Sequence, residues 1–256
     1  MIIDIHCHAG TGDGLTGPWD TRASLKKYQQ RANEAGIDKT VLFPAFHSDY
    51  KTANKELASI VSNADGRYYG FAFVDPVRDR GRNYTMIQTA IQRYHFSGIK
   101  VHRHNNRITR EICDVAKVFS LPILYDIAGE VSVCELLAQE YPDVNFIIPH
   151  MGSFADDWRA QLALIDHLVR HKNIYTDTAG VRRFDLLEQA VQRAGSEKIL
   201  FGSDGPWLHP GVELEKIYLL GLSEQEEQNI LGGNFLRLIS KINRSAKLNR
   251  DLKVSA

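Results

Sequence analysis

The sequence predicts a single α/β domain folded as a (β/α)8 barrel, or TIM barrel. Short apolar runs recur at intervals of roughly 25 to 30 residues, and each is followed by an amphipathic stretch with helical periodicity. The runs are continuous rather than alternating, which is typical of parallel strands covered by helices. Eight such repeats in 256 residues suit a barrel of this kind. A doubly wound open sheet is the alternative, but that fold usually has a glycine-rich turn after its first strand.

The expected strands are rich in Val, Ile, Leu and Phe, which favour buried sheet positions. They lie at Met1–His8, Lys39–Ala45, Tyr68–Asp75, Gly98–His102, Pro122–Ala128, Val144–His150, Asn173–Thr178 and Lys198–Gly202. None of these runs approaches the ~20 apolar residues that a membrane span needs.

The expected helices follow the strands in order. They lie at Arg22–Ala35, Asn54–Ala64, Tyr84–His95, Ile108–Phe119, Val131–Glu140, Asp157–His171, Phe184–Ala194 and Ser223–Ile242. Ser223 and Glu226 have the spacing of a capping box at the start of the last helix. Gly36 and Gly195 stand where helices commonly end.

The composition excludes several classes of protein. Thirty-one basic and 31 acidic residues balance, which leaves no electrostatic footprint for nucleic acid or an anionic membrane. Three cysteines are too few for a disulfide framework and favour a reducing compartment. The first residues lack the pattern of a signal peptide, so we expect a cytoplasmic protein.

Two segments fall outside the regular repeat. Residues 1–244 are expected to form the barrel domain, and the polar segment 245–256 a frayed C-terminal tail. Ala9–Trp19 carries four glycines and is interpreted either as a lid over the barrel mouth or as a plain connection.

The most specific local feature is the pair His6 and His8 at the end of the first expected strand. Because strand side chains alternate between faces, these imidazoles point the same way and Cys7 points the opposite way. They stand about 6.6 Å apart along the backbone and can converge on one cation. Taken alone, a pair of hydrogen-bonded core histidines explains the pattern equally well.

Chemically active side chains also recur at the ends of later strands. They are Lys100, His102, Asp126, His150, Asp177 and Asp204. In a (β/α)8 barrel the carboxyl ends of all strands meet at one mouth, where catalytic groups lie. Each of these side chains could by itself cap a strand end. Their recurrence at one mouth predicts an active site.

Five segments, in order along nearly the whole chain, carry a family resemblance. They are His6-Cys7-His8, Gly98-Ile99-Lys100-Val101-His102, Pro149-His150-Met151-Gly152, Leu200-Phe201-Gly202-Ser203-Asp204-Gly205-Pro206 and Ile230-Leu231-Gly232-Gly233-Asn234-Phe235. Together they resemble the amidohydrolase superfamily, in particular its amidohydrolase-related branch. That branch includes lactone hydrolases and non-oxidative decarboxylases. The resemblance implies a metal-bearing barrel.

The resemblance implies that His6, His8 and Asp204 bind one divalent metal ion. In the hydrolases, this aspartate also accepts the proton of the water that the metal activates, and His150 matches a catalytic histidine that faces the substrate. The chemistry is coherent, because a divalent ion acidifies water, a carboxylate can accept the proton and a histidine can stabilise the oxyanion. Zinc is the expected ion, with manganese as the alternative.

Asp126 departs from the family pattern, which usually has a histidine at the end of the fifth strand. We expect Asp126 to be a further metal ligand, which gives two histidines and two carboxylates. That set would admit manganese as readily as zinc. In the competing interpretation Asp126 is not a ligand, and the metal is weakened or lost.

Further side chains are expected to contact the substrate. They are Lys100, His102, Arg103, Arg78 and Trp207. The forked donors of arginine match a carboxylate, whereas solvated loop arginines are the competing interpretation. Trp207 could stack on a planar substrate. In binuclear relatives a lysine on the fourth strand bridges two metals, but Lys100 fits better the branch with one metal.

The leading functional hypothesis is a metal-dependent hydrolase of a small ester, lactone or amide, with Asp204 as general base. The first alternative is a non-oxidative decarboxylase that uses the same metal site. The second is a metal-free ligand-binding barrel. We expect a small-molecule substrate and no nucleic-acid or membrane partner, and the family resemblance suggests a homodimer.

Overall fold

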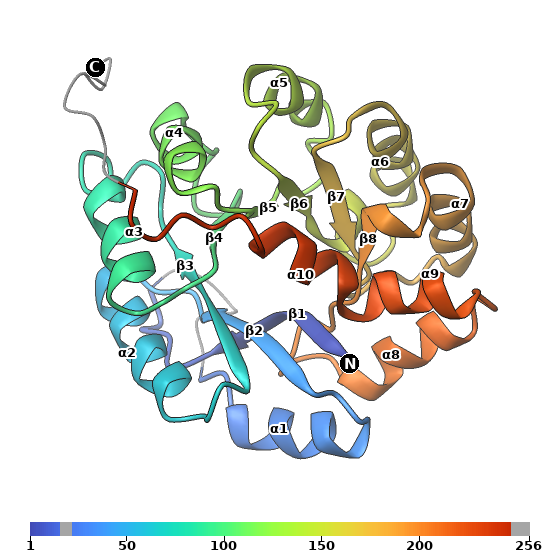
Figure 1. Cartoon of the computed structure of the whole chain (residues 1–256), viewed down its shortest axis with the longest axis horizontal. Coiled ribbons are helices and arrows are strands. Elements are labelled where there is room, and N and C mark those ends of the chain that lie inside the picture. Colours follow the sequence, from blue (N-terminus) through green and yellow to red (C-terminus); the bar gives the residue numbers. More distant parts are fainter. Residues whose placement is uncertain (16–21, 247–256) are drawn as a thin grey trace.

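Eight parallel strands form one sheet in chain order in the computed structural model, which describes residues 1–15 and 22–246 (Figure 1). The strands are β1 (Ile3–Ala9), β2 (Lys39–Pro44), β3 (Tyr68–Phe73), β4 (Gly98–His102), β5 (Ile123–Asp126), β6 (Phe146–Ile148), β7 (Ile174–Asp177) and β8 (Ile199–Leu200). Each overlaps one of the runs predicted from the sequence.

Backbone hydrogen bonds close the sheet into a barrel. The Ile5 N–H donates to the Phe201 carbonyl at 3.0 Å, and the His8 N–H donates to the Gly205 carbonyl at 2.7 Å. Both acceptors lie just after β8, so the chain beyond the last strand completes the pairing with β1. The predicted single-domain (β/α)8 barrel is confirmed.

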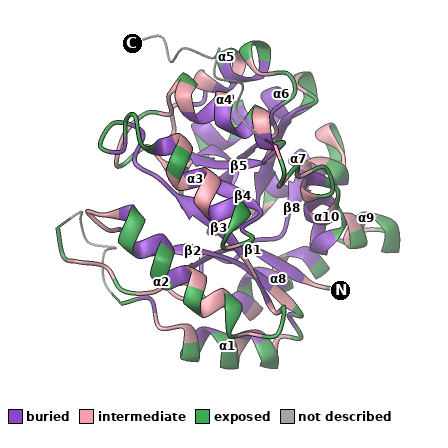
Figure 2. Cartoon of the chain, turned by 60° about the vertical axis from the view of Figure 1, so that its left-hand side comes forward, coloured by how far each residue is buried: buried purple, intermediate pink, exposed green. Residues whose placement is uncertain are grey.

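Helices surround the barrel (Figure 1). They are α1 (Leu25–Glu34), α2 (Tyr50–Ser62), α3 (Asn83–Gln92), α4 (Arg110–Phe119), α5 (Val133–Glu140), α6 (Trp158–Arg170), α7 (Phe184–Ala194), α8 (Pro210–Tyr218), α9 (Glu224–Gln228) and α10 (Asn234–Ile239). The strands are almost entirely buried, and the exposed residues lie mainly on helices and loops (Figure 2). In the described part of the chain, no helix has both the length and the apolar character to cross a membrane.

Helix α8 was not expected from the sequence. The His209 Nδ1 caps its start by accepting a hydrogen bond from the Gly211 N–H at 3.2 Å. Pro210 occupies the first helical position, where its missing N–H costs no hydrogen bond. That position of proline was the signal that could have predicted the helix.

The prediction of one continuous helix over Ser223–Ile242 is wrong. Helices α9 and α10 are separated by a π turn, and the backbone leaves the helical conformation at Gly232. A Cβ at Gly232 would lie 3.0 Å from the Met1 carbonyl oxygen, so a side chain here would crowd the start of the chain, and glycine avoids this contact. The capping box of Ser223 and Glu226 at the start of α9 is confirmed.

The two largest apolar clusters hold the fold together. The larger lies between the strands and the surrounding helices, and the smaller fills the barrel interior. The interior cluster includes Ile3, Phe71 and, from α10, Phe235, whose ring centroid lies 5.0 Å from that of Tyr69. Since Ile3 and Tyr69 stand near the amino ends of their strands, α10 closes the end of the barrel opposite the mouth (Figure 1).

The predicted tail and lid are described only in part. In the tail, the Ala246 carbonyl accepts a hydrogen bond from the Gln92 side chain at 3.3 Å. In the predicted lid, the Asp13 carboxylate accepts from the Ser48 N–H at 2.9 Å. Residues 247–256 of the tail and 16–19 of the lid lie outside the described residues.

Candidate metal centre and substrate pocket

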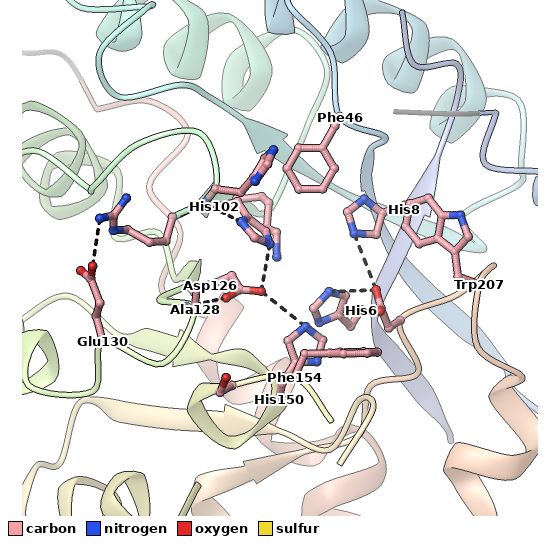
Figure 3. Close-up of a pocket in the computed structure, with 15 residues that line it drawn as sticks. His6, His8, Phe46, His102, Asp126, Ala128, Glu130, His150, Phe154 and Trp207 are labelled. Carbon is pink, nitrogen blue, oxygen red and sulfur yellow. Dashed lines mark hydrogen bonds and ion pairs between the residues drawn. The ribbon is translucent and has the colours of Figure 1, made fainter. Parts of the chain in front are cut away.

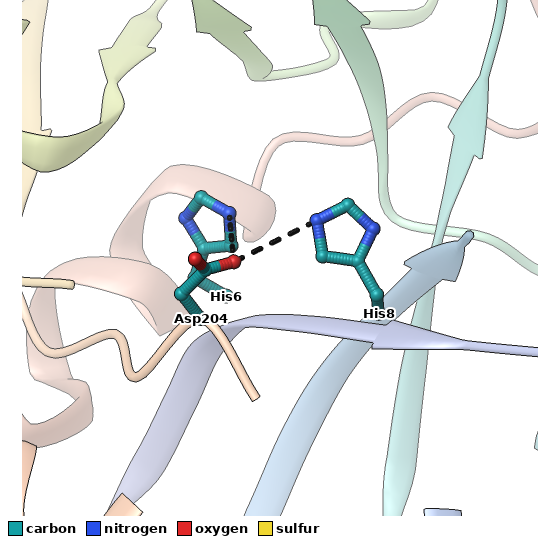
Figure 4. A group of neighbouring side chains, drawn as sticks. All are labelled: His6, His8 and Asp204. Atoms are coloured by element: carbon teal, nitrogen blue, oxygen red, sulfur yellow. Dashed lines mark ion pairs between the residues drawn. The ribbon is translucent and has the colours of Figure 1, made fainter. Parts of the chain in front are cut away.

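Three potential metal ligands from opposite ends of the chain converge at the barrel mouth. His6 and His8 come from β1, and Asp204 lies in the loop after β8 (Figure 4). The Asp204 Oδ1 is 3.5 Å from the His6 Nε2 and 3.7 Å from the His8 Nε2. We call this group the mouth cluster. Two imidazole nitrogens and a carboxylate oxygen, all within 4.8 Å of one another, can bind one divalent ion.

An irregularity in β1 turns both histidines toward the inside of the barrel. Strict alternation would put Ile5 and His6 on opposite faces, yet Ile5 packs in the interior cluster and His6 joins the mouth cluster. The pairing of β1 with β2 shifts register between Asp4 and Cys7, because β1 has one extra residue there. Cys7 packs in the larger apolar cluster, between the strands and the helices, so its predicted orientation opposite to His6 and His8 is confirmed.

The second nitrogen of each imidazole is held by its own acceptor. The His6 Nδ1 lies 2.7 Å from Asp177 Oδ2, and the His8 Nδ1 lies 3.0 Å from the Pro44 carbonyl oxygen. Both rings therefore carry their proton on Nδ1 and leave Nε2 free to bind a metal. Burial lowers the pKa of His6 to about 3 and the pKa of His8 well below its usual value, so both are neutral, as metal ligands must be.

Asp177, the last residue of β7, positions two parts of the site at once. Besides His6, it accepts the backbone N–H groups of His150 at 2.9 Å and Ala179 at 3.1 Å. Burial alone would raise the pKa of Asp177, but its interaction with His6 leads the effects that lower it. Its place at a strand end was the one sequence signal for Asp177, and no role followed from that signal.

The loop that carries Asp204 is anchored by buried Asp4. The Asp4 carboxylate accepts the backbone N–H groups of Ser203 at 2.9 Å and His6 at 3.1 Å. A Cβ on Gly202 would lie 2.9 Å from the His6 Cβ, so the loop can approach β1 only with glycine there. β1 and the loop after β8 therefore hold each other in place.

The carboxyl group of Asp204 carries a charge that its surroundings do not fully compensate. Burial raises the pKa of Asp204 to about 7, although His150 and Lys100 lower it in part. A cation bound in the mouth cluster would offset this burial and restore the ionised form. The chemistry of the donor set therefore fits a resident divalent ion.

Asp126, the last residue of β5, lies between two histidines (Figure 3). Its Oδ2 is 3.0 Å from the His102 Nε2 and 3.5 Å from the His150 Nε2. The His102 Nδ1 accepts the His104 N–H at 2.9 Å, so the proton of His102 lies on Nε2 and points to Asp126. The ligand atoms of the mouth cluster lie within 4.8 Å of one another, and among the described residues Asp126 is not part of that group. Metal binding by Asp126 stays a prediction.

His150 lies in the tight turn after β6 and has a left-handed backbone, with φ 57°. Its Nδ1 is 2.7 Å from the Ala179 carbonyl oxygen, to which it donates. Burial alone would lower the pKa of His150, but Asp126, Asp177 and Asp204 outweigh burial and raise the pKa to about 9. The ring is therefore a proton donor at neutral pH.

Lys100 from β4 is completely buried and lines the cavity at the mouth. Its Nζ lies 4.8 Å from the Phe43 ring centroid and has no hydrogen-bond partner within the described chain. Burial lowers the pKa of Lys100, and the charges of the nearby aspartates oppose this effect. A buried ammonium without a partner costs free energy, so this donor is suited to an anionic group of a bound ligand.

A cavity of about 560 Å³ opens above the mouth cluster (Figure 3). Its walls contain four of the predicted substrate contacts, Lys100, His102, Arg103 and Trp207. The Trp207 ring centroid lies 4.6 Å from that of His8, which places the indole next to the metal ligands. Sequence reasoning did not single out five other lining residues, Phe46, Ala128, Glu130, Ser153 and Phe154.

The rim of the cavity carries paired charges. Glu130 lies 2.9 Å from the Arg103 Nη2 and 3.1 Å from the Arg107 Nε, so two cations share one carboxylate. The Arg103 Nε is buried and has no partner among the described residues. Arg78 does not line the cavity, and its Nη1 donates to the Ser48 carbonyl at 2.7 Å.

Comparison with known proteins places the chain in a family. The sequence profile described as Amidohydrolase matches residues 3–239. The chain belongs to this family. No curated protein matches this amidohydrolase chain by sequence.

Solved structures share the fold of this chain. The 5-carboxyvanillate decarboxylase of Sphingomonas paucimobilis is 14% identical, with 94% of this chain and 99% of that chain covered and a TM-score of 0.75. A dihydroxybenzoic acid decarboxylase from Polaromonas, with bound manganese and 2-nitroresorcinol, is 17% identical and has a TM-score of 0.70. The match covers 93% of this chain and 96% of that chain. A probable 2-pyrone-4,6-dicarboxylic acid hydrolase from Acinetobacter baumannii is 15% identical and has a TM-score of 0.70. The match covers 93% of this chain and 99% of that chain. Identities this low establish the fold alone.

Proposed function

We propose that this protein is a metal-dependent hydrolase of an ester, lactone or amide in a small carboxylated molecule. The mouth cluster carries the proposal, because two neutral imidazoles and a partly buried carboxylate converge beside a cavity large enough for a small substrate. The proposal extends the family membership to a reaction, which neither the fold nor the family decides.

The donors suit one divalent ion, held by His6, His8 and Asp204. Zinc is the first candidate for two imidazoles and a carboxylate. If Asp126 also binds the ion, manganese becomes equally suitable, since carboxylates favour it. Manganese is the ion bound in the Polaromonas decarboxylase. The bound ion would act as a Lewis acid on the substrate carbonyl and lower the pKa of the attacking water.

The side chains around the ion have separate roles in this proposal. Asp204 directs Oδ1 to the two histidines, so its Oδ2 can accept the proton of the attacking water. His150 lines the cavity in its protonated form and would stabilise the developing negative charge on the carbonyl oxygen. Asp126 and His102 hold the His150 ring in place through the contact at its Nε2.

Two hydrogen-bond donors without partners in the cavity wall are the reason for proposing a substrate with a carboxylate. The Lys100 Nζ and the Arg103 Nε are both buried without partners among the described residues. A substrate carboxylate would satisfy them with charge-assisted hydrogen bonds. Trp207 is positioned beside His8 to pack on a planar substrate. Arg78 stays a prediction for the outer rim.

A second candidate function is non-oxidative decarboxylation in the same site. Lys100 favours it, because a cation next to the mouth cluster could hold the carboxylate that leaves as carbon dioxide. Two of the three solved structures compared above are decarboxylases.

The cytoplasmic location, the homodimer and the absence of nucleic-acid and membrane partners also stay predictions.

Metal analysis of protein purified without chelator is the first test. About one equivalent of zinc or manganese is expected, and its loss in an Asp126→Ala variant would add Asp126 to the ligand set. A screen of lactones, esters and carboxylic acids then separates the reactions, since hydrolysis releases a proton and decarboxylation releases carbon dioxide. Failure to bind either metal when it is added would contradict both reactions and support a metal-free ligand-binding barrel.

A further inference from the structure

Outside the barrel, three potential metal ligands from neighbouring helices lie together. Glu135 belongs to α5, His167 belongs to α6, and His171 directly follows α6. Their ligand atoms lie within 4.8 Å of one another, and none of the three lines the cavity at the mouth. The two histidines are one helical turn apart, the spacing that puts two imidazoles on one helix face. We call this group the outer cluster.

The geometry of the outer cluster directs its donors toward a common point. Glu135 Oε2 lies 3.0 Å from the His171 Nε2 and 3.7 Å from the His167 Nδ1. The imidazoles stack with their centroids 5.6 Å apart, and their side chains are only 11% and 13% exposed. Gln139 donates to the other oxygen of Glu135 at 2.6 Å, which orients the carboxylate and leaves Oε2 to face the histidines.

A cation already occupies this point in the form of Arg170. Its Nη1 lies 3.4 Å from Glu135 Oε2, and its Nη2 lies 3.4 Å from the His167 Nδ1, which is therefore an acceptor. The Arg170 side chain is 55% exposed, so it can swing into solvent without leaving a cavity in the core. Two of the three ligand atoms, Glu135 Oε2 and His167 Nδ1, thus face a positive charge that a metal ion could replace.

We propose that Glu135, His167 and His171 form a second divalent-metal site, suited to zinc, that joins α5 to α6. The ligands are Glu135 Oε2, His167 Nδ1 and His171 Nε2, and solvent supplies the fourth position of a tetrahedral set. His171 moves its proton to Nδ1 when it binds. Burial and the charge of Arg170 lower the pKa of His167, so this imidazole is neutral at pH 7. Metal that binds only the folded chain stabilises it.

Zinc and cobalt titrations of the whole chain test this site. The variants are His171→Gln, which removes a ligand, and Arg170→Ala, which removes the competing cation. His95→Asn changes an exposed histidine elsewhere and is the matched control. Bound zinc is measured by elemental analysis after gel filtration, and cobalt by its visible absorption. An Asp204→Asn background isolates the outer cluster from the mouth cluster.

In the Asp204→Asn background, one zinc is expected to bind and to be lost with His171→Gln. The loss of affinity is expected to be at least the ~10-fold that follows when a metal-binding histidine loses the hydrogen-bond partner behind it. Arg170→Ala is expected to raise the zinc affinity several-fold, and His95→Asn to leave it unchanged. The proposal would be overturned if neither His171→Gln nor Arg170→Ala changed the zinc affinity. It would also be overturned if no zinc bound. A mouth cluster without metal leaves this test intact, because the two sites lose their ions in different variants.

Discussion

Replacing Asp177 by asparagine tests how the metal ligand His6 is positioned. Asp177 uses one oxygen for the His6 Nδ1–H at 2.7 Å and the other for the N–H groups of His150 and Ala179. Asparagine has only one acceptor oxygen, and its NH2 group must face either the imidazole or the two backbone donors. If the NH2 faces His6, the ring moves its proton to Nε2 and loses the lone pair that binds metal.

The expected magnitude follows from the role of this partner. Loss of a carboxylate behind a metal-binding histidine typically weakens metal affinity by about 10- to 100-fold. That range corresponds to about 1.4 to 2.8 kcal/mol of binding free energy. If the NH2 instead faces the backbone donors, two buried N–H groups lose their acceptor, at a cost of about 1 to 3 kcal/mol each in the free energy of unfolding.

Competition with a chelator measures the zinc affinity of Asp177→Asn, and urea denaturation measures its stability. Asp79→Asn is the matched control, since Asp79 is equally buried but hydrogen-bonds Asp75 and Arg82 rather than a metal ligand. The control should lose stability and keep its zinc affinity. Wild-type zinc affinity and activity in Asp177→Asn would refute the reasoning, because the proton position on His6 would then not depend on Asp177.

Three further predictions address the substrate, the pH dependence and the closed end of the barrel opposite the mouth. Lys100→Met should keep the metal and lower kcat/KM for a carboxylated substrate by about 10- to 100-fold, the value of one charged hydrogen bond; equal kinetics would exclude Lys100 from substrate binding. Hydrogen bonds from Arg103 and Arg107 lower the pKa of Glu130 to about 2. The ionised Glu130 therefore stabilises the fold above pH 4.5, and this stabilisation is lost as the pH falls toward 2. Acid titration of stability should therefore show a difference between wild type and Glu130→Gln that fades over that window, and a constant difference would contradict it. Phe235→Ala should cost about 3 to 5 kcal/mol in urea denaturation, because the ring fills the closed end of the barrel; a loss below 1 kcal/mol would show that this end repacks.

Local patterns were enough to predict the barrel and the metal-ligand pair. The apolar runs identify all eight strands, because a strand buried on both faces shows its character in its own residues. His6 and His8 stand two residues apart on one strand, so their common orientation is a local property. The two failures in the helices have different causes: the missed helix after Pro210 had a local capping signal, whereas the break at Gly232 depends on a contact with Met1 that helical periodicity does not register.

What the sequence by itself determined is which chemical groups reach the mouth of the barrel. Which of them touch was decided by the tertiary structure. The bulge in β1 that turns His6 inward, the pairing of His6 with Asp177 and the placement of Asp126 between His102 and His150 all depend on neighbouring strands. Hydrogen bonds between strands far apart in the chain depend on register and backbone position to within an ångström. Composition and spacing carry no information at that scale, so the partners of each group appear only when the barrel closes.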